Sequence, residues 1–175
     1  MLKRLSRALP VALALMGCSA PSEILDVSYD DRFGERTTMD IYLPAGEPTQ
    51  SPAIVMIHGG AWRFGSKDAY RDAAVRMARS GWVAVTINYR LGSAGMYPRA
   101  VQDCVCAISF LRRNADDYGI DPNRVAVTGY SAGGHLASLV GLAADLPEHV
   151  PDCASGGTTL PNAIISAAGA QDLHG

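Results

Sequence analysis

The chain has 175 residues and a formal net charge of −2, with 48% hydrophobic and 18% charged residues. This length and composition indicate one ordinary globular domain with enough apolar material to build a core. The sequence has no basic excess and no basic stripe interleaved with aromatic residues, so we expect no nucleic acid partner.

The first twenty residues differ from the rest of the sequence. A positively charged stretch precedes an almost wholly apolar run over residues 9–16, and small residues follow. This is the layout of a secretory signal, and the apolar run is too short to span a bilayer stably. The sequence LMGC at 15–18 resembles the lipobox of bacterial lipoproteins, in which the cysteine becomes lipidated. We therefore expect export to the periplasm or outer membrane, with a lipid on Cys18 as the only membrane contact; a plain signal peptide over 1–20 is the alternative.

Two segments near the start of the domain alternate apolar and polar residues. Residues 24–31 and 37–43 follow this pattern, which is typical of half-buried strands. The Gly-containing sequence RFGER separates them and predicts a turn. We therefore expect an antiparallel hairpin at one edge of the sheet.

From residue 53 onward, buried strands alternate with helices in the sequence. The apolar runs predict strands at 53–58, 82–89, 121–130 (after an initial turn) and 162–169, and the intervening patterns predict helices at 66–80, 98–118 and 132–144. Ser66 is the expected N-cap of the first helix, and Gly81 its stop. This alternation predicts an α/β fold over 24–175, with a mostly parallel sheet, an antiparallel leading hairpin and helices on both faces.

The sequence GYSAGG at 129–134 places one serine at the junction between a predicted strand and a predicted helix. A sharp turn there crowds the backbone, so Gly129 and Gly133 must lack side chains and the serine is expected to be strained. The hydroxyl of Ser131 would stand above the carboxyl ends of the strands, where open α/β sheets bind ligands. The motif alone is weak, but the strand before it and the helix after it favour a nucleophile over a serine that serves packing alone.

A second glycine-rich motif, IHGGAW at 57–62, ends a buried strand and opens a loop. We expect the N–H groups of Gly60 and Ala61 to join the N–H of Ala132 around a carbonyl oxygen and to stabilise the charge that develops when a serine attacks an ester.

The other residues of this motif are expected to support the loop. His58 is expected to hold its shape rather than to act as a base, Gly59 to allow close approach of the backbone, and Trp62 to pack.

With these two motifs, the chain resembles the α/β-hydrolase superfamily, and within it the esterase/lipase branch that carries His-Gly-Gly-x-Trp and Gly-x-Ser-Ala-Gly-Gly. The sequences INYRL, YPRAVQD and YGIDPNRV between the motifs also match, and the resemblance runs from about residue 25 to the end. It implies a carboxylic ester hydrolase that needs no metal and no organic cofactor and forms an acyl-enzyme. The implied substrates are small-molecule or carbohydrate-linked acyl esters, as in feruloyl or acetyl-xylan esterases. Kynurenine formamidases share both motifs.

The partners of the serine are harder to find. A serine nucleophile needs a histidine oriented by a carboxylate, in the chain order Ser, acid, His. His149 lies in a polar, Pro-containing segment, Asp172 and His174 are two residues apart on one stretch, and His135 is expected to be structural. We therefore expect the acid and the histidine beyond Gly175, in a longer hydrolase whose last strand here leaves an apolar sheet edge uncovered.

Two other functions stay open on this sequence. One is a catalytically inactive or truncated surface lipoprotein that keeps the pocket for binding. The other is a formamidase or amidase that uses the same machinery.

The cysteines leave their pairing undecided. If Cys18 carries a lipid, Cys104, Cys106 and Cys153 remain, and three cannot all pair with one another. Cys104 and Cys106 would face different ways on a helix, so one of them bridges to Cys153 or all stay reduced and buried. Their spacing is poor for zinc, and we expect no metal site.

Overall fold

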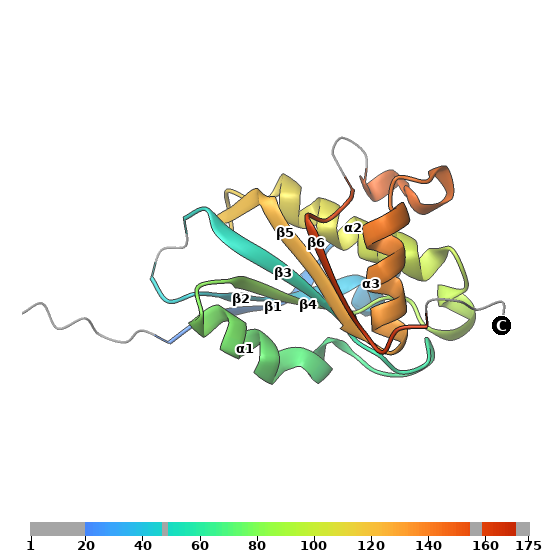
Figure 1. The fold of residues 1–175 in the computed structure, drawn as a ribbon, viewed down its shortest axis with the longest axis horizontal. Coiled ribbons are helices and arrows are strands. Elements are labelled where there is room, and N and C mark those ends of the chain that lie inside the picture. Colours follow the sequence, from blue (N-terminus) through green and yellow to red (C-terminus); the bar gives the residue numbers. More distant parts are fainter. Residues whose placement is uncertain (1–19, 47–48, 155–158, 171–175) are drawn as a thin grey trace, which may run out of the picture.

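The computed structural model describes residues 20–46, 49–154 and 159–170 (Figure 1). Six strands of this part form one sheet in the order β1-β2-β4-β3-β5-β6. The strands are β1 (Ser22–Ser28), β2 (Thr38–Leu43), β3 (Ser51–Ile57), β4 (Val83–Ile87), β5 (Ile120–Tyr130) and β6 (Ala163–Ala167). β1 pairs antiparallel with β2, and β2 with β4, whereas β4, β3, β5 and β6 run parallel to one another. The predicted α/β fold with a leading hairpin is confirmed.

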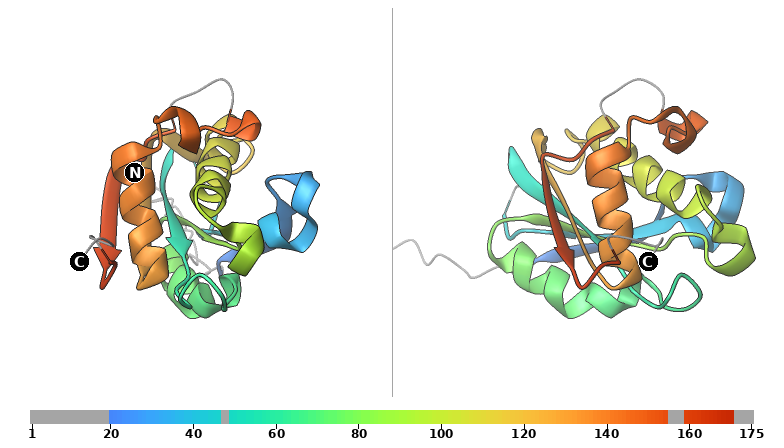
Figure 2. Two further views of the ribbon diagram at one scale, coloured as in Figure 1. Left: turned by 90° about the vertical axis from the view of Figure 1, so that its right-hand side faces the viewer. Right: turned by 45° about the vertical axis from the view of Figure 1, so that its right-hand side comes forward.

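Helices cover both faces of the sheet. α2 (Arg99–Arg113) and α3 (Ala132–Ala143) lie on one face, and α1 (Arg71–Arg79) lies on the other (Figures 1 and 2). The side chains of β3 alternate accordingly, because successive residues of a strand point to opposite faces. Val55 and Ile57 belong to the core under α2 and α3, and Ile54 and Met56 to the core under α1. A strand buried on both faces has to be continuously apolar, which explains the run AIVMI.

Several predicted strands and helices are shorter in the structure. The strand expected at 82–89 is Val83–Ile87, and the strand expected at 162–169 is Ala163–Ala167. The helix expected to reach residue 118 ends at Arg113, because Asn114 donates from its main chain and its side chain to the Phe110 carbonyl and closes the last turn. The helix expected from Ser66 begins as a 3₁₀ turn, Lys67–Tyr70, which the Ser66 hydroxyl caps, and continues as α1.

The parallel register brings three chain segments to one edge of the sheet. Ile57, the last residue of β3, pairs with Ile87 at the end of β4 and with Gly129 near the end of β5. The segments that follow these strands therefore leave the sheet side by side. They are the 58–66 loop, the 88–92 segment and Ser131 with α3.

β6 is the last strand in the order of the sheet and forms an edge strand that is exposed along its whole length. Its apolar side chains Ile164 and Ile165 are 37% and 56% exposed, so the uncovered apolar edge expected from the sequence is present. Within residues 20–46, 49–154 and 159–170, no helix combines the length and apolar character needed to cross a bilayer.

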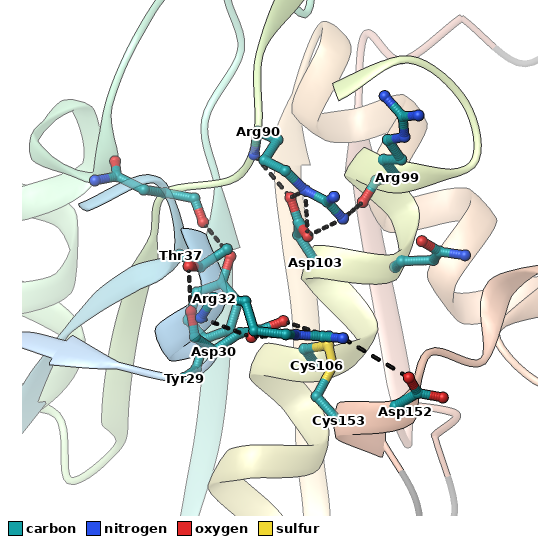
Figure 3. A network of polar contacts seen from close by, with 12 residues as sticks. Tyr29, Asp30, Arg32, Thr37, Arg90, Arg99, Asp103, Cys106, Asp152 and Cys153 are labelled. Atoms are coloured by element: carbon teal, nitrogen blue, oxygen red, sulfur yellow. Dashed lines mark hydrogen bonds and ion pairs between the residues drawn. A yellow bond between two sulfur atoms is a disulfide. The ribbon is translucent and has the colours of Figure 1, made fainter. Parts of the chain in front are cut away.

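A disulfide joins Cys106 of α2 to Cys153 in a short 3₁₀ helix (Asp152–Ala154), with Cα atoms 5.6 Å apart (Figure 3). Cys104, on a different side of α2, is buried and free. Asp30 lies close enough to both sulfurs to form a three-ligand group, but the sulfurs are bonded to each other and the Asp30 carboxylate pairs with Arg32 at 2.8 Å. This cluster is therefore a cross-link beside an ion pair.

Candidate active site

The serine at the end of β5 has a strained backbone. Ser131 has φ 55° and ψ −122°, a combination that residues other than glycine rarely adopt. Such a conformation costs about 1–3 kcal/mol and persists only where the surroundings enforce it. Here the Ser131 N–H donates to the Ala167 carbonyl at 2.9 Å, and its carbonyl accepts from His135 N–H at 3.0 Å. The strain predicted for this position is confirmed, and the side chain is half-buried.

The glycines around the serine are required by contacts with main-chain atoms. A Cβ on Gly133 would lie 2.0 Å from the Ile57 carbonyl oxygen, and a Cβ on Gly129 would lie 2.3 Å from the Gly133 carbonyl carbon. A Cβ on Gly134 would lie 2.7 Å from the Ala167 carbonyl oxygen. Backbone atoms at these distances cannot rotate aside as a side chain does, so the turn closes only with glycine at all three positions.

The 58–66 loop runs directly against this turn. A Cβ on Gly59 would lie 2.8 Å from the Tyr130 carbonyl oxygen and 3.4 Å from Ser131 Cβ. Gly60, Ala61 and Trp62 all have positive φ, at 120°, 51° and 58°. The structure therefore brings the two glycine-rich motifs, about 70 residues apart in the sequence, into contact.

This loop conformation leaves main-chain donors available. The Gly60 carbonyl accepts from the N–H groups of Arg63 and Phe64, each at 3.0 Å. Within the described part of the chain, the N–H groups of Gly60 and Ala61 donate to no acceptor. The N–H of Ala132 belongs to the first turn of α3, where no intrahelical acceptor exists, and the Ser131 side chain does not cap it. Donors of this kind suit a developing negative charge.

The His58 ring begins the loop and is 1% exposed. Its Nδ1 lies 2.7 Å from the Gly59 carbonyl oxygen, and because a carbonyl only accepts, Nδ1 carries the hydrogen. The ring stacks on Tyr89 with centroids 4.4 Å apart. Burial lowers the pKa of His58, so the imidazole is neutral near pH 7.

The rings of the other two described histidines also contact groups other than the Ser131 hydroxyl. His135 Nδ1 lies 2.6 Å from the Ala170 carbonyl oxygen, and its ring meets Trp62 edge-on. His149 is buried, with Nδ1 2.7 Å from the Ala143 carbonyl oxygen and Nε2 2.9 Å from the Tyr97 hydroxyl. None of the three described histidine rings hydrogen-bonds the Ser131 hydroxyl. The sequence candidates Asp172 and His174, and the predicted signal with Cys18, lie outside the described residues.

A cavity of about 790 Å³ opens beside the loop and the helix. Its lining comes from the 58–66 loop, from the segment around residues 92–97, from the start of α2 and from the first two turns of α3. Most of these side chains are apolar or aromatic: Trp62, Met96, Tyr97, Val101, Leu136 and Leu139. The site therefore combines a strained serine and free N–H groups with an adjacent apolar pocket.

Comparisons with known proteins point to one family. The family model BD-FAE matches residues 39–175. Esterase LipC of Mycobacterium tuberculosis is 36% identical over 136 residues, covering 77% of this chain and 34% of that protein. LipM of the same organism, a probable carboxylic ester hydrolase, is 33% identical over 79% of this chain and 33% of its own length. The chain thus spans about a third of the length of the curated relatives it matches.

Solved structures give the same result. The propionate-bound esterase Est2 of Thermogutta terrifontis has a TM-score of 0.69 and 28% identity, over 85% of this chain and 55% of that one. A bifunctional GH43-CE protein of Bacteroides eggerthii has a TM-score of 0.64 and 35% identity, over 68% of this chain and 16% of that one.

Proposed function

The chain belongs to the BD-FAE family of α/β-hydrolase esterases, and from this membership we propose that the whole protein hydrolyses carboxylic esters through an acyl-enzyme on Ser131. The observation that carries the proposal is the contact between the strained Ser131 turn and the 58–66 loop. Strain at a single serine, enforced by three glycines that touch only backbone, has no evident purpose in packing.

In the proposed mechanism, Ser131 Oγ attacks the ester carbonyl carbon while a histidine base accepts its proton. The carbonyl oxygen becomes an oxyanion, which the N–H groups of Gly60, Ala61 and Ala132 stabilise. Loss of one such donor raises the barrier by about 3 kcal/mol in a studied protease. The tetrahedral intermediate expels the alcohol, which takes the proton from the histidine. Water then attacks the acyl-enzyme by the same route and releases the acid.

In this proposal, the base and its carboxylate partner come from outside the described residues. His58 and His149 are buried and His135 is turned to Ala170, as their hydrogen bonds indicate. The 58–66 loop and the Ser131 turn supply the nucleophile and the oxyanion donors, so this part of the chain contributes half of the proposed machinery.

For the substrate, we propose an acyl ester of a small molecule or a carbohydrate. The cavity beside the loop, with the Trp62 and Tyr97 rings in its wall, suits an apolar or aromatic group of such an ester. A structural relative that is 32% identical and is described as a truncated form of a carbohydrate esterase from gut microbiota supports the carbohydrate option. No metal or organic cofactor is required for this chemistry.

We also propose that the protein is exported and held at a membrane by a lipid on Cys18. The motif LMGC supports this proposal. Metabolic labelling with a fatty-acid analogue tests it, since a Cys18→Ser variant has to lose the label while the wild type keeps it. Equal labelling of both proteins would contradict a lipid anchor at this cysteine.

The catalytic proposal is tested with the whole protein, a fluorophosphonate probe and p-nitrophenyl esters of short acids. We expect the wild type to be labelled and to hydrolyse the esters, and Ser131→Ala to lose both properties. Ser138→Ala is the matched control, because Ser138 lies on the same helix and only bonds the Gly134 carbonyl.

The same assay separates the alternatives. An unlabelled, inactive wild type would indicate a relative that keeps the pocket for binding alone. Faster cleavage of N-formyl amides than of acyl esters would indicate a formamidase.

A further inference from the structure

The segment that follows β4, residues 88–92, contacts the 58–66 loop at His58 and Trp62 and contacts Lys67 directly after it. Both segments leave the same edge of the sheet, because β3 and β4 are parallel neighbours that end in register at Ile57 and Ile87. The contacts between them are hydrogen bonds and one ring stack, and they occur at the beginning, the middle and the end of the loop.

At the beginning of the loop, the Tyr89 hydroxyl donates to the His58 carbonyl at 2.9 Å. In the middle, the Gly92 N–H donates to the Trp62 carbonyl at 2.7 Å. After the last residue, the Lys67 N–H donates to the Asn88 side-chain oxygen at 2.8 Å. The 88–92 segment therefore supports the conformation of the loop from outside at three points.

The contact made by Tyr89 is the one nearest the serine. The His58 carbonyl oxygen that accepts from Tyr89 lies 2.7 Å from the position a Cβ on Gly133 would take, so it packs against the first turn of α3. The next peptide along the chain carries Gly59, which abuts Ser131. The rings of Tyr89 and His58 also stack, and both residues are buried, at 2% and 1% exposure. Rotation of the His58–Gly59 peptide is thereby blocked on two sides.

The 88–92 segment is itself anchored to α2 (Figure 3). The Arg90 guanidinium pairs with the Asp103 carboxylate at 2.6 Å, and the Arg90 N–H donates to the same carboxylate at 2.8 Å. Both side chains are buried or nearly so, at 11% and 1% exposure. Because these bonds restrict the motion of the 88–92 segment, the segment can hold the 58–66 loop in a fixed position relative to α3.

We propose that Tyr89 is a positioning residue for the oxyanion donors, which holds the His58–Gly59 peptide so that the N–H groups of Gly60 and Ala61 face the Ser131 hydroxyl. This inference rests on the proposed ester hydrolysis and adds a residue that touches neither substrate nor serine. Burial raises the pKa of Tyr89, so the hydroxyl remains a donor throughout the working pH range. Misplacement of catalytic donors by about 1 Å costs about a hundredfold in rate, so loss of this single bond has a measurable effect.

The test compares Tyr89→Phe with Tyr29→Phe in the whole protein. Tyr29 is equally buried, and its hydroxyl donates to one main-chain carbonyl, that of Asn88, at 2.5 Å. Asn88 keeps its other bonds, to Thr38 and Glu35, when that hydroxyl is removed, and Tyr29 bonds no residue of the loop. The two variants thus lose one similar buried hydrogen bond each, and only one of those bonds reaches the loop.

We expect Tyr89→Phe to lower kcat at least tenfold with KM changed less than twofold, and to weaken binding of a trifluoromethyl ketone, which forms an oxyanion on the serine, by a similar factor. Tyr29→Phe should keep kcat within twofold of the wild type. Equal kcat losses in both variants, or an unchanged kcat in Tyr89→Phe, would overturn the proposal.

Hydrogen exchange provides a readout that does not depend on activity. If the wild type hydrolyses no ester, the proposed function fails, but the positioning claim is still decided by the loop amides of Arg63 and Phe64, which donate to the Gly60 carbonyl. These amides have to exchange at least tenfold faster in Tyr89→Phe than in Tyr29→Phe; equal exchange rates would refute the positioning role.

Discussion

Replacing Gly133 by alanine is the sharpest test of how the Ser131 turn is built. The added Cβ would lie 2.0 Å from the Ile57 carbonyl oxygen, about 1.4 Å short of an ordinary 3.4 Å contact, and 2.7 Å from the His58 carbonyl oxygen. Both obstacles are main chain in the middle of the molecule, so either β3 or α3 has to move. Overpacking of this kind costs typically 1–3 kcal/mol, and we expect the upper end, about 3 kcal/mol. For a domain of this size that lowers Tm by about 6–12 °C.

The assay measures Tm and fluorophosphonate labelling of the whole protein. Gly141→Ala is the matched control, because Gly141 lies on the same helix and its Cβ would meet side-chain atoms of Ile164, which is 37% exposed, rather than main chain. The alanine there also gains about 1 kcal/mol of helix propensity, so the net change should be small. We expect labelling to fall at least a hundredfold in Gly133→Ala, since the turn shifts by about 1 Å, and to persist in Gly141→Ala. Equal Tm values for Gly133→Ala and the wild type would refute the reasoning.

Three further predictions concern stability. Burial lowers the pKa of His58, so the contribution of this residue to stability is present above the unfolded-state pKa of about 6.5 and is lost as the pH falls through the folded-state value. The urea midpoint of unfolding should therefore decrease when the pH is lowered from 7.5 to 5.5, and it should decrease less in His58→Gln. An equal dependence of the urea midpoint on pH in the wild type and in His58→Gln would contradict this prediction. Cys153→Ser opens the 47-residue loop to Cys106 and should cost about 4 kcal/mol; reductant should then lower Tm only in the wild type. Lys67→Met leaves the Asp40 carboxylate, which is 3% exposed, without its ammonium partner at 2.7 Å. We expect the free energy of unfolding, measured in urea, to decrease by about 3 kcal/mol. A decrease below about 1 kcal/mol would argue against a buried ion pair.

The sequence predicted those parts of the fold that follow from local rules. A short, continuously apolar run such as 53–57 is typical of a strand that is covered on both faces. The GYSAGG pattern predicts a sharp turn because steric crowding at such a turn excludes side chains from fixed positions. The strain at Ser131 was therefore predictable before any coordinates, although its partners in space were not.

At the end of α2, the prediction from the local sequence pattern was wrong. The stretch after Arg113 holds no proline and no glycine before Gly119, so the pattern favoured a longer helix. At the helix end, the main chain and the side chain of Asn114 both donate to the Phe110 carbonyl, a local bond that asparagine offers in many contexts without ending a helix. The presence of Asn114 was the available signal, and it is a weak one.

Contacts between distant segments could not be read from the sequence. The INYRL motif was noticed only as a resemblance, and nothing in its composition indicates that Tyr89 and Asn88 hold both ends of the 58–66 loop. The choice between Cys104 and Cys106 likewise depends on which side of α2 faces Cys153, and the sequence fixes the angle between the two cysteines but not the rotation of the helix.

The central claim is that the Ser131 hydroxyl faces the amides of the 58–66 loop and α3. A crystal structure of the whole protein with a phosphonate bound to Ser131 measures this directly, because one phosphonate oxygen stands where the oxyanion would form. We predict that this oxygen lies within about 3 Å of the main-chain nitrogens of Gly60, Ala61 and Ala132. A phosphonate oxygen that contacts none of these nitrogens, or a serine that stays unmodified while the ester is hydrolysed, would contradict the account.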